Sequence, residues 1–153
     1  MKTTHLINRL EQVYSGDPWY GSCIADILNQ QFVDPNFSIG NGNSIGQIVE
    51  HMIAWRNFTM EKLKGNGEYD ITSTTDWQKG KTYSTSDFSR LAEDFKTSHK
   101  ELITLLSRQS SDEWLANEVP GRKYNFEYLM EGILEHDIYH LGQISLLKSG
   151  SEK

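Results

Sequence analysis

The sequence predicts an all-α protein, a four-helix bundle with a long crossover connection and a first helix broken near residues 16–18. Apolar side chains recur every three or four residues along four long stretches, which is the spacing of one face of a helix. Alternating patterns typical of strands are scarce, and no segment repeats at a fixed period. The four expected helices have about 12 to 25 residues each, which is longer than an average helix and favours a bundle.

Length and charge are consistent with one globular domain that spans residues 1–153. A chain of 153 residues with 37% hydrophobic residues can bury a sizeable core. The formal net charge of −6 has the wrong sign for neutralising phosphates or anionic lipids, so we expect no nucleic acid and no membrane as partners. No apolar run approaches the roughly 20 residues of a membrane helix, and the N-terminus does not resemble a signal peptide.

The single cysteine, Cys23, cannot form an intramolecular disulfide, which fits a reducing compartment. We therefore expect a cytoplasmic protein. One cysteine also excludes a cysteine-cluster zinc site, so any metal must be held by histidines and carboxylates. No feature of the sequence around Cys23 lowers the pKa of its thiol, and we expect it to be a buried, inert residue.

The first predicted helix is interrupted at Gly16. Its inward stripe consists of Leu6, Leu10 and either Val13 or Tyr14. Asp17 is the expected N-cap of a second run, with Pro18 at the first helical position, where a missing N–H costs nothing. That run starts near Trp19, places Gln31 on its last turn and ends before the next proline.

The second long helix is predicted from the capping-box pair Ser44 and Gln47 to about Lys64. Its inward stripe consists of Ile48, His51 or Met52, Trp55 and Phe58. Residues 65–84 follow as the longest irregular stretch, rich in Gly, Ser and Thr. Because long loops in compact domains are often functional, we expect this crossover to contribute to the site.

The third long helix is predicted to be capped by Ser86 and Asp87 and to end near Ser110. Its stripe consists of Phe88, Leu91, Phe95, Leu102, Leu105 and Leu106. The last helix opens at about Asn125 and runs to Lys148. Its stripe consists of Phe126, Leu129, Ile133, His136 and Asp137, His140, Ile144 and Leu147.

His136 and His140 are the most informative pair in the chain. Four residues apart in a helix, they are separated by about 400° of rotation and about 6 Å of rise, so both imidazoles project from one face. Because they share that face with apolar residues, they point into the core, where an imidazole needs a partner. A third imidazole, from His51 on the facing helix, would give three nitrogen ligands with open positions, as in catalytic zinc sites. The alternative is that the histidines bond to carboxylates such as Glu50, Glu131 or Glu135.

Other candidates carry weaker signals. His136 and His140 share the spacing of the zinc-protease motif His-Glu-x-x-His, but Asp137 is one methylene shorter than glutamate, and a small bundle offers no cleft for an extended peptide. His99 is expected to be partly buried, either as a partner of a metal ligand or with no metal role. Of the aromatic residues, which are mostly expected in the core, Trp55 and Trp77 could line a pocket above the metal.

Three segments resemble the DinB-like superfamily, the DinB/YfiT-like metalloenzymes. The stretch 131–144 is similar to the closing motif of that family, His-x-x-x-His followed by Gly-Gln-Ile. The stretch 44–55 is similar to its other signature, in which a histidine precedes a tryptophan by one turn. Residues 18–21, Pro-Trp-Tyr-Gly, resemble the Trp-His-Gly opening of one branch, with Tyr20 where a histidine is often found. The resemblance covers nearly the whole chain.

The resemblance implies an up-down-up-down type of bundle with a long crossover, a homodimer, and a divalent metal ion, nickel or zinc. Carried over residue by residue, the ligands are His51, His136 and His140. Some members of the family are S-transferases or isomerases that use low-molecular-weight thiols. Fold and site transfer within a family better than chemistry does.

Two functions therefore remain open. The first is a metal-dependent enzyme, S-transferase-like or hydrolase-like, that acts on a small-molecule substrate or a low-molecular-weight thiol through an activated thiol or water. The second is a non-enzymatic, stress-related metal-binding or dimeric interaction protein whose metal is structural. No catalytic base is assigned, because Glu50, Asp137 and Tyr139 adjoin ligands in the chain and would point some 100° away from them, as second-layer or surface groups.

Overall fold

The computed structural model describes residues 1–29 and 34–152 of the 153-residue chain. Its elements, in order, are α1 (Thr3–Ser15), α2 (Ile24–Leu28), α3 (Ile45–Leu63), α4 (Ser73–Asp76), α5 (Thr85–Ser107), the 3₁₀ helix η1 (Glu113–Ala116) and α6 (Phe126–Ser151). Within the described ranges every element is helical, which confirms the predicted all-α class. The turn expected at Gln31 lies outside the described residues.

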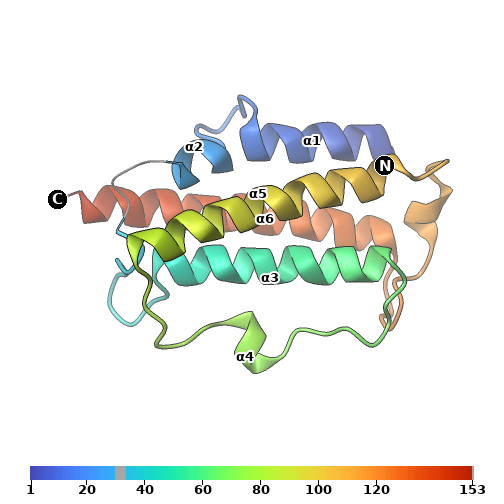
Figure 1. The fold of residues 1–153 in the computed structure, drawn as a ribbon. Helices are drawn as coiled ribbons and strands as arrows, with labels where there is room; N and C mark the ends of the chain where they lie inside the picture. The colour runs from blue at the N-terminus through green and yellow to red at the C-terminus, as the bar shows by residue number, and fades with distance from the viewer. Residues whose placement is uncertain (30–33, 153) are drawn as a thin grey trace.

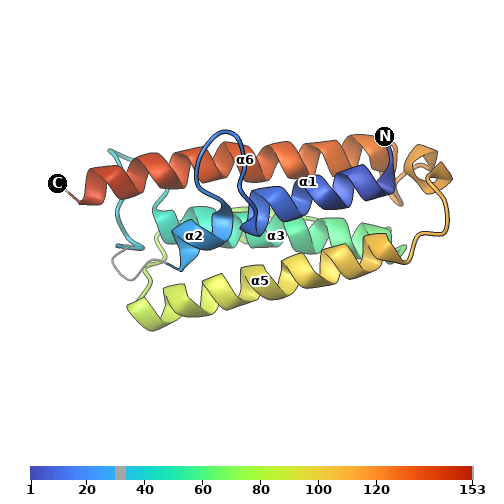
Figure 2. The ribbon, with the colours of Figure 1, turned by 90° about the horizontal axis from the view of Figure 1, so that it is seen from above.

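Helices α1, α3, α5 and α6 lie side by side, as Figures 1 and 2 both show. Helices α1 and α3 each pack against both α5 and α6. All four long helices contribute fully buried apolar side chains to one core, among them Leu10, Val49, Phe95 and Met130. This packing brings the inward stripes of α3 and α6 face to face.

The crossover between α3 and α5 sets the direction of the helices. It returns along the outside of α3 and carries the short helix α4, so that α3 and α5 run in the same direction while α1 and α6 run in the opposite one (Figure 1). The up-down-up-down order implied by the family resemblance is therefore wrong, and the predicted long crossover is the reason. Because the crossover spans the length of the bundle, α5 begins at the same end of the bundle as α3 does (Figure 1).

Side-chain caps fix where three of the long helices begin. The predicted capping box of Ser44 and Gln47 opens α3, and the Asn125 side chain accepts a hydrogen bond from the backbone N–H of Tyr128 at the start of α6. Helix α5 starts earlier than predicted, because Ser84 is its N-cap and forms the capping box with Asp87.

The prediction of a helical run from Trp19 is wrong. Helix α2 begins only at Ile24, after the N-cap Cys23, and Trp19 is fully exposed instead of lying in the core. Gly21 adopts a φ of 132°, a conformation that a right-handed helix cannot contain. The chain therefore leaves α1 through a turn, in which the Gly21 N–H donates to the Pro18 carbonyl.

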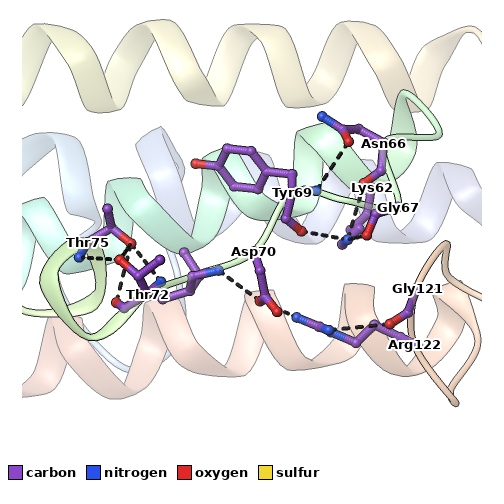
Figure 3. Close-up of polar contacts among 10 residues, drawn as sticks. Lys62, Asn66, Gly67, Tyr69, Asp70, Thr72, Thr75, Gly121 and Arg122 are labelled. Atoms are coloured by element: carbon purple, nitrogen blue, oxygen red, sulfur yellow. Dashed lines mark hydrogen bonds and ion pairs between the residues drawn. The ribbon is translucent and has the colours of Figure 1, made fainter.

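A buried lysine ties the start of the crossover to α3. The Lys62 side chain is fully buried, and its ammonium donates to the carbonyl oxygens of Asn66, Gly67 and Tyr69 at 3.1, 2.9 and 2.7 Å (Figure 3). All three protons of the ammonium thus have acceptors, which is what a buried charge requires. The first residues of the crossover wrap around the end of this one side chain.

A second anchor joins the crossover to the segment that precedes α6. The Asp70 carboxylate pairs with the Arg122 guanidinium (Figure 3). Gly121, with a φ of 75°, lies directly against Gly67, where an added Cβ would come within 2.6 Å of the Gly67 carbonyl oxygen. Only glycine allows this close approach. The crossover is therefore fixed near its start, before it reaches α4.

Candidate metal centre

Three imidazoles meet between α3 and α6. His51 comes from α3 and His136 and His140 from α6, and their ring centroids lie 4.4 to 4.9 Å apart. One ligand atom from each residue can be chosen so that all three lie within 4.8 Å of one another. His51 and His140 are only 6% and 4% exposed. The structure therefore brings together the three histidines that the sequence singled out.

The hydrogen bonds of His51 determine which of its nitrogens carries the proton. Its Nδ1 lies 2.9 Å from the carbonyl oxygen of Asp76 and 3.0 Å from the carboxylate Oδ1 of the same residue. Both oxygens can only accept, so Nδ1 must be the donor and Nε2 keeps a free lone pair. Trp55 Nε1 donates to the same Oδ1 at 2.9 Å, and the Trp77 ring stacks on the imidazole at 3.8 Å between centroids.

The two histidines of α6 are arranged differently. His140 Nδ1 donates to Gln143 Oε1 at 2.6 Å, which leaves the Nε2 lone pair of His140 free. His136 Nε2 lies 2.9 Å from His51 Nε2, and its buried Nδ1 has no hydrogen-bond partner within the described residues. His51 and His136 therefore contact each other through their Nε2 atoms, which point toward the centre of the cluster.

Burial lowers the pKa of two histidines of this cluster. Burial, followed by the neighbouring imidazoles of His140 and His51, lowers the pKa of His136 to about 3. Burial also lowers the pKa of His140. A metal ligand must be deprotonated, and three neutral imidazoles suit zinc, nickel, iron or copper. Because His51 Nε2 presents a lone pair, His136 Nε2 donates its proton to it at 2.9 Å. A divalent ion bound to both nitrogens would take the place of that proton, and the donor set fits such an ion.

The cluster borders a cavity of about 650 Å³. All three histidines line it, as do Trp55 and Trp77, the two tryptophans that the sequence suggested for a pocket. The remaining lining residues are Ile39, Gly42, Asn43, Ile48, Asp76, Tyr139, Gln143, Leu146 and Leu147. A volume of this size can admit a small molecule, so an ion on the three imidazoles would be accessible from the cavity.

The carboxylate that contacts the cluster is Asp76, which the sequence did not single out. The alternative in which Glu50 bonds to a histidine does not hold, because Glu50 pairs with Lys81 at 2.7 Å and accepts from the Tyr83 hydroxyl. Asp76 is 25 residues from His51 in the chain and reaches it through the crossover. The expectation that residues 65–84 contribute to the site is therefore confirmed, but only the fold identifies which residue does so.

Asp137 has a role that the sequence did not predict. It is fully buried and forms an ion pair with Arg56, also fully buried, at 2.5 Å between Oδ2 and the guanidinium. Burial raises the pKa of Asp137, and the Arg56 guanidinium opposes that rise. Asp137 is thus neither a catalytic base nor a surface group, whereas Tyr139 is exposed as expected. The signal that could have found the pair is Asp137 itself, a charged residue on the inward stripe of the last helix.

His99 extends this charged network away from the cluster. It is 3% exposed, with Nδ1 3.4 Å from the Arg56 guanidinium and its ring stacked on Tyr14 at 4.1 Å. Burial, followed by the positive charge of Arg56, lowers the pKa of His99 to about 4, against a weaker opposing effect of Glu11. His99 therefore contacts Arg56, the partner of Asp137, and is not one of the three clustered histidines.

The remaining polar candidates lie outside the site. Cys23 is buried, and burial raises the pKa of its thiol, which supports the expectation of an inert residue. His5 is exposed on α1. Among the described residues, no helix is both long and apolar enough to cross a membrane.

An all-α fold with three convergent imidazoles on a cavity defines a candidate metal-binding protein. The sequence profile of the DinB superfamily matches residues 25–144, which include all three histidines, and the chain belongs to this family. Searches of the curated proteins and of the solved structures gave no match.

Proposed function

We propose that this protein is a metal-dependent enzyme that holds a divalent ion, nickel or zinc, on His51, His136 and His140. The observation that carries the proposal is the convergence of three imidazoles, all bordering one cavity of about 650 Å³. Membership of the DinB superfamily supports metal binding at this place. The substrate is a small molecule, and a low-molecular-weight thiol is the first candidate.

The reaction we propose is S-transferase-like or hydrolase-like. A divalent ion on neutral ligands supplies a Lewis acid that lowers the pKa of a thiol or water at neutral pH. The chain itself supplies orientation: Asp76 fixes the ring of His51, and Gln143 fixes that of His140. The stacked Trp77 and the nearby Trp55 form an aromatic wall that restricts water around the histidines.

A purely structural ion is the competing function, as in a non-enzymatic stress-related metal-binding or dimeric interaction protein. Structural metal sites are closed by four protein ligands, whereas catalytic sites keep an open position. Among the described residues the cluster contains three histidines, and all three line the cavity. This arrangement favours the enzyme over the structural ion.

We also propose that the protein is a cytoplasmic homodimer. The lone buried cysteine supports the compartment. Three large side chains of α6 that border cavities of the protein, Tyr128, Tyr139 and Leu146, are each at least 64% exposed, and a second copy packed beside them would reduce this exposure. Light scattering that gives the mass of a single chain at micromolar concentration would contradict the dimer.

The metal site is tested by elemental analysis of the purified protein. We expect about one divalent ion per chain, as one three-ligand site can hold. Simultaneous replacement of His51, His136 and His140 by Ala should remove the ion, whereas replacement of the exposed His5 by Ala should not. Retention of the ion by the triple variant would refute the site.

Activity is tested separately, with thiol consumption by an electrophile and with ester hydrolysis. Metal-loaded wild-type protein should turn over one of these substrates, and His140→Ala should reduce turnover by at least about 10²-fold if the ion is essential. A protein that binds its ion and shows no metal-dependent turnover with any small thiol or ester supports the structural alternative instead.

A further inference from the structure

A second, smaller cavity lies beside the three histidines. It has a volume of about 230 Å³ and is formed by α3, α6 and the segment just before α6. Trp55 and His136 line both this cavity and the larger one. The two spaces therefore meet at these two side chains, and a ligand in the smaller cavity would contact one of the candidate metal ligands.

The walls of the smaller cavity carry no charge among the described residues. They consist largely of the rings of Trp55, Tyr124 and Tyr128 and the aliphatic side chains of Leu129 and Ile133. The Thr59 hydroxyl also lines it, but this hydroxyl already donates to the Trp55 carbonyl oxygen at 2.9 Å. A charged group placed here would lose its hydration without gaining a partner. The wall chemistry therefore selects an uncharged, apolar occupant.

The volume indicates how large that occupant is. A dry apolar cavity of about 150 Å³ in a protein core can hold benzene. At about 230 Å³, the smaller cavity has room for one aromatic ring with a short substituent. Aromatic side chains in the wall can contact such a ring edge-to-face or in an offset stack. Tyr124 and Tyr128, with centroids 5.2 Å apart and tilted by 53°, already adopt a geometry of this kind.

Gly132 forms part of the wall and keeps the cavity open. It lies within α6, where glycine is a poor helix former, and a Cβ added there would meet nothing within 4 Å. Packing of the chain against itself therefore does not require glycine at this position. Gly142 is equally open and lies in the same helix, but it lines neither cavity. The two glycines form a matched pair for an experiment.

We propose that the smaller cavity is a binding subsite for an uncharged aromatic group of the substrate, placed so that the polar part of the same molecule reaches the three histidines. The assignment to a substrate rests on the proposed function, whereas the binding of an aromatic group depends only on the cavity. An aryl-bearing electrophile or ester fits this arrangement better than a small, fully polar molecule does. The partner of the thiol or water in the proposed reaction is thus an aromatic compound.

The test uses metal-free protein and a neutral fluorinated probe, 4-fluorobenzyl alcohol, whose binding is followed by ¹⁹F NMR. Wild-type protein should show saturable binding. Gly132→Leu, which places a side chain in the cavity, should weaken binding by at least about tenfold, or about 1.4 kcal/mol, whereas Gly142→Leu should change it by less than about twofold. The charged analogues 4-fluorobenzoate and 4-fluorobenzylamine should bind at least about tenfold more weakly than the alcohol.

Two controls make the result specific. Both leucine variants should melt at or above the temperature of the wild type, because leucine is the better helix former and its Cβ meets nothing within 4 Å at either position. Gly132→Met, with a more flexible side chain, should also weaken binding and serves if the leucine variant fails to fold. The ring carbon signals of His136 should shift when the probe binds to wild-type protein.

Several outcomes would overturn the subsite. Equal affinity in Gly132→Leu and the wild type would place the probe elsewhere, for example in the larger cavity, and equal loss in Gly142→Leu would show a non-local effect. The absence of saturable binding to the wild type would also end the proposal. The probe experiment contains no metal, so it can be interpreted independently of the metal site. If the probe binds but elemental analysis finds no ion in the purified protein, the subsite is supported and the proposed enzyme is refuted. If the ion is found but the probe does not bind, the metal site is supported and the subsite is refuted.

Discussion

For the Arg56–Asp137 ion pair, we expect that replacing one partner lowers the unfolding free energy strongly, whereas replacing both partners by apolar residues lowers it little. Both side chains are fully buried and 2.5 Å apart, so neither can recover its hydration when the other is removed. Removing one partner of a buried pair costs about 3–5 kcal/mol, while replacing both by apolar residues of similar volume is often nearly neutral. We therefore expect Asp137→Leu to lose about 3–5 kcal/mol of unfolding free energy, and the double variant Arg56→Met with Asp137→Leu to lose far less than the sum of the single changes.

The two single variants should differ in their pH dependence. Asp137→Leu removes the titrating carboxyl and leaves Arg56, which cannot lose its proton, so neither group should make the stability of this variant vary between pH 5 and pH 7. In Arg56→Met the buried Asp137 carboxyl can take up a proton, because burial raises its pKa. The folded variant then binds more protons than the unfolded chain, and its stability relative to the wild type should rise as the pH falls.

Urea denaturation of metal-free protein at both pH values measures these differences, and thermal melting should show single-variant shifts of roughly 6–20 °C for a domain of this size. The exposed pair Lys96 and Glu93, 3.7 Å apart on α5, is the control, and Glu93→Ala should change stability by less than about 1 kcal/mol. Costs below about 1 kcal/mol for Asp137→Leu, or a double variant equal to the sum of the singles, would show that the two charges do not depend on each other.

Three further predictions concern the site and its supports. Asp76→Ala removes the carboxylate that contacts His51 Nδ1 and accepts from Trp55 Nε1, but it keeps the Asp76 carbonyl contact to His51. It should therefore lower metal affinity by about tenfold, as isothermal titration would show, with exposed Asp94→Ala as the unchanged control. The pKa of His99 is about 4 in the folded protein and 6.5 in the unfolded chain, so the unfolded chain binds more protons between these pH values. The unfolding free energy of the wild type should therefore be highest above pH 6.5 and fall by up to about 3 kcal/mol as the pH falls toward 4. Denaturation curves of His99→Gln should lack this pH-dependent loss. Lys62→Met should cost at least about 2 kcal/mol, because three carbonyl groups lose a charged donor; unchanged urea midpoints would contradict this.

Features encoded by neighbouring residues could be predicted from the sequence. The capping box at Ser44 and Gln47 is specified within four residues, and so is the pairing of His136 with His140 on one face of α6. His51 was added because it lies on an inward stripe, and the facing packing of α3 and α6 brings it to the pair. Local periodicity thus determined both the helices and the three candidate ligands.

Features that depend on long-range contacts could not be predicted. The Asp76–His51 contact spans 25 residues and exists only because the crossover folds back over α3. The Arg56–Asp137 pair spans 81 residues, and each charge alone resembles an exception in an apolar stripe. Trp19 shows the opposite error, since an aromatic residue was expected in the core, but the turn at Gly21 ends the helical path and leaves the ring exposed.

The crossover connects stability to the site. Lys62 and Arg122 anchor its first part (Figure 3). A few residues later the same segment brings Asp76 to His51 and Trp77 to the face of that imidazole. The three candidate ligands come from two rigid helices, but the group that fixes the proton of His51 comes from this loop. Loosening the loop should therefore weaken metal binding without any change in the two helices that carry the ligands, because the ring of His51 could turn and its free lone pair would no longer be held toward the centre of the cluster.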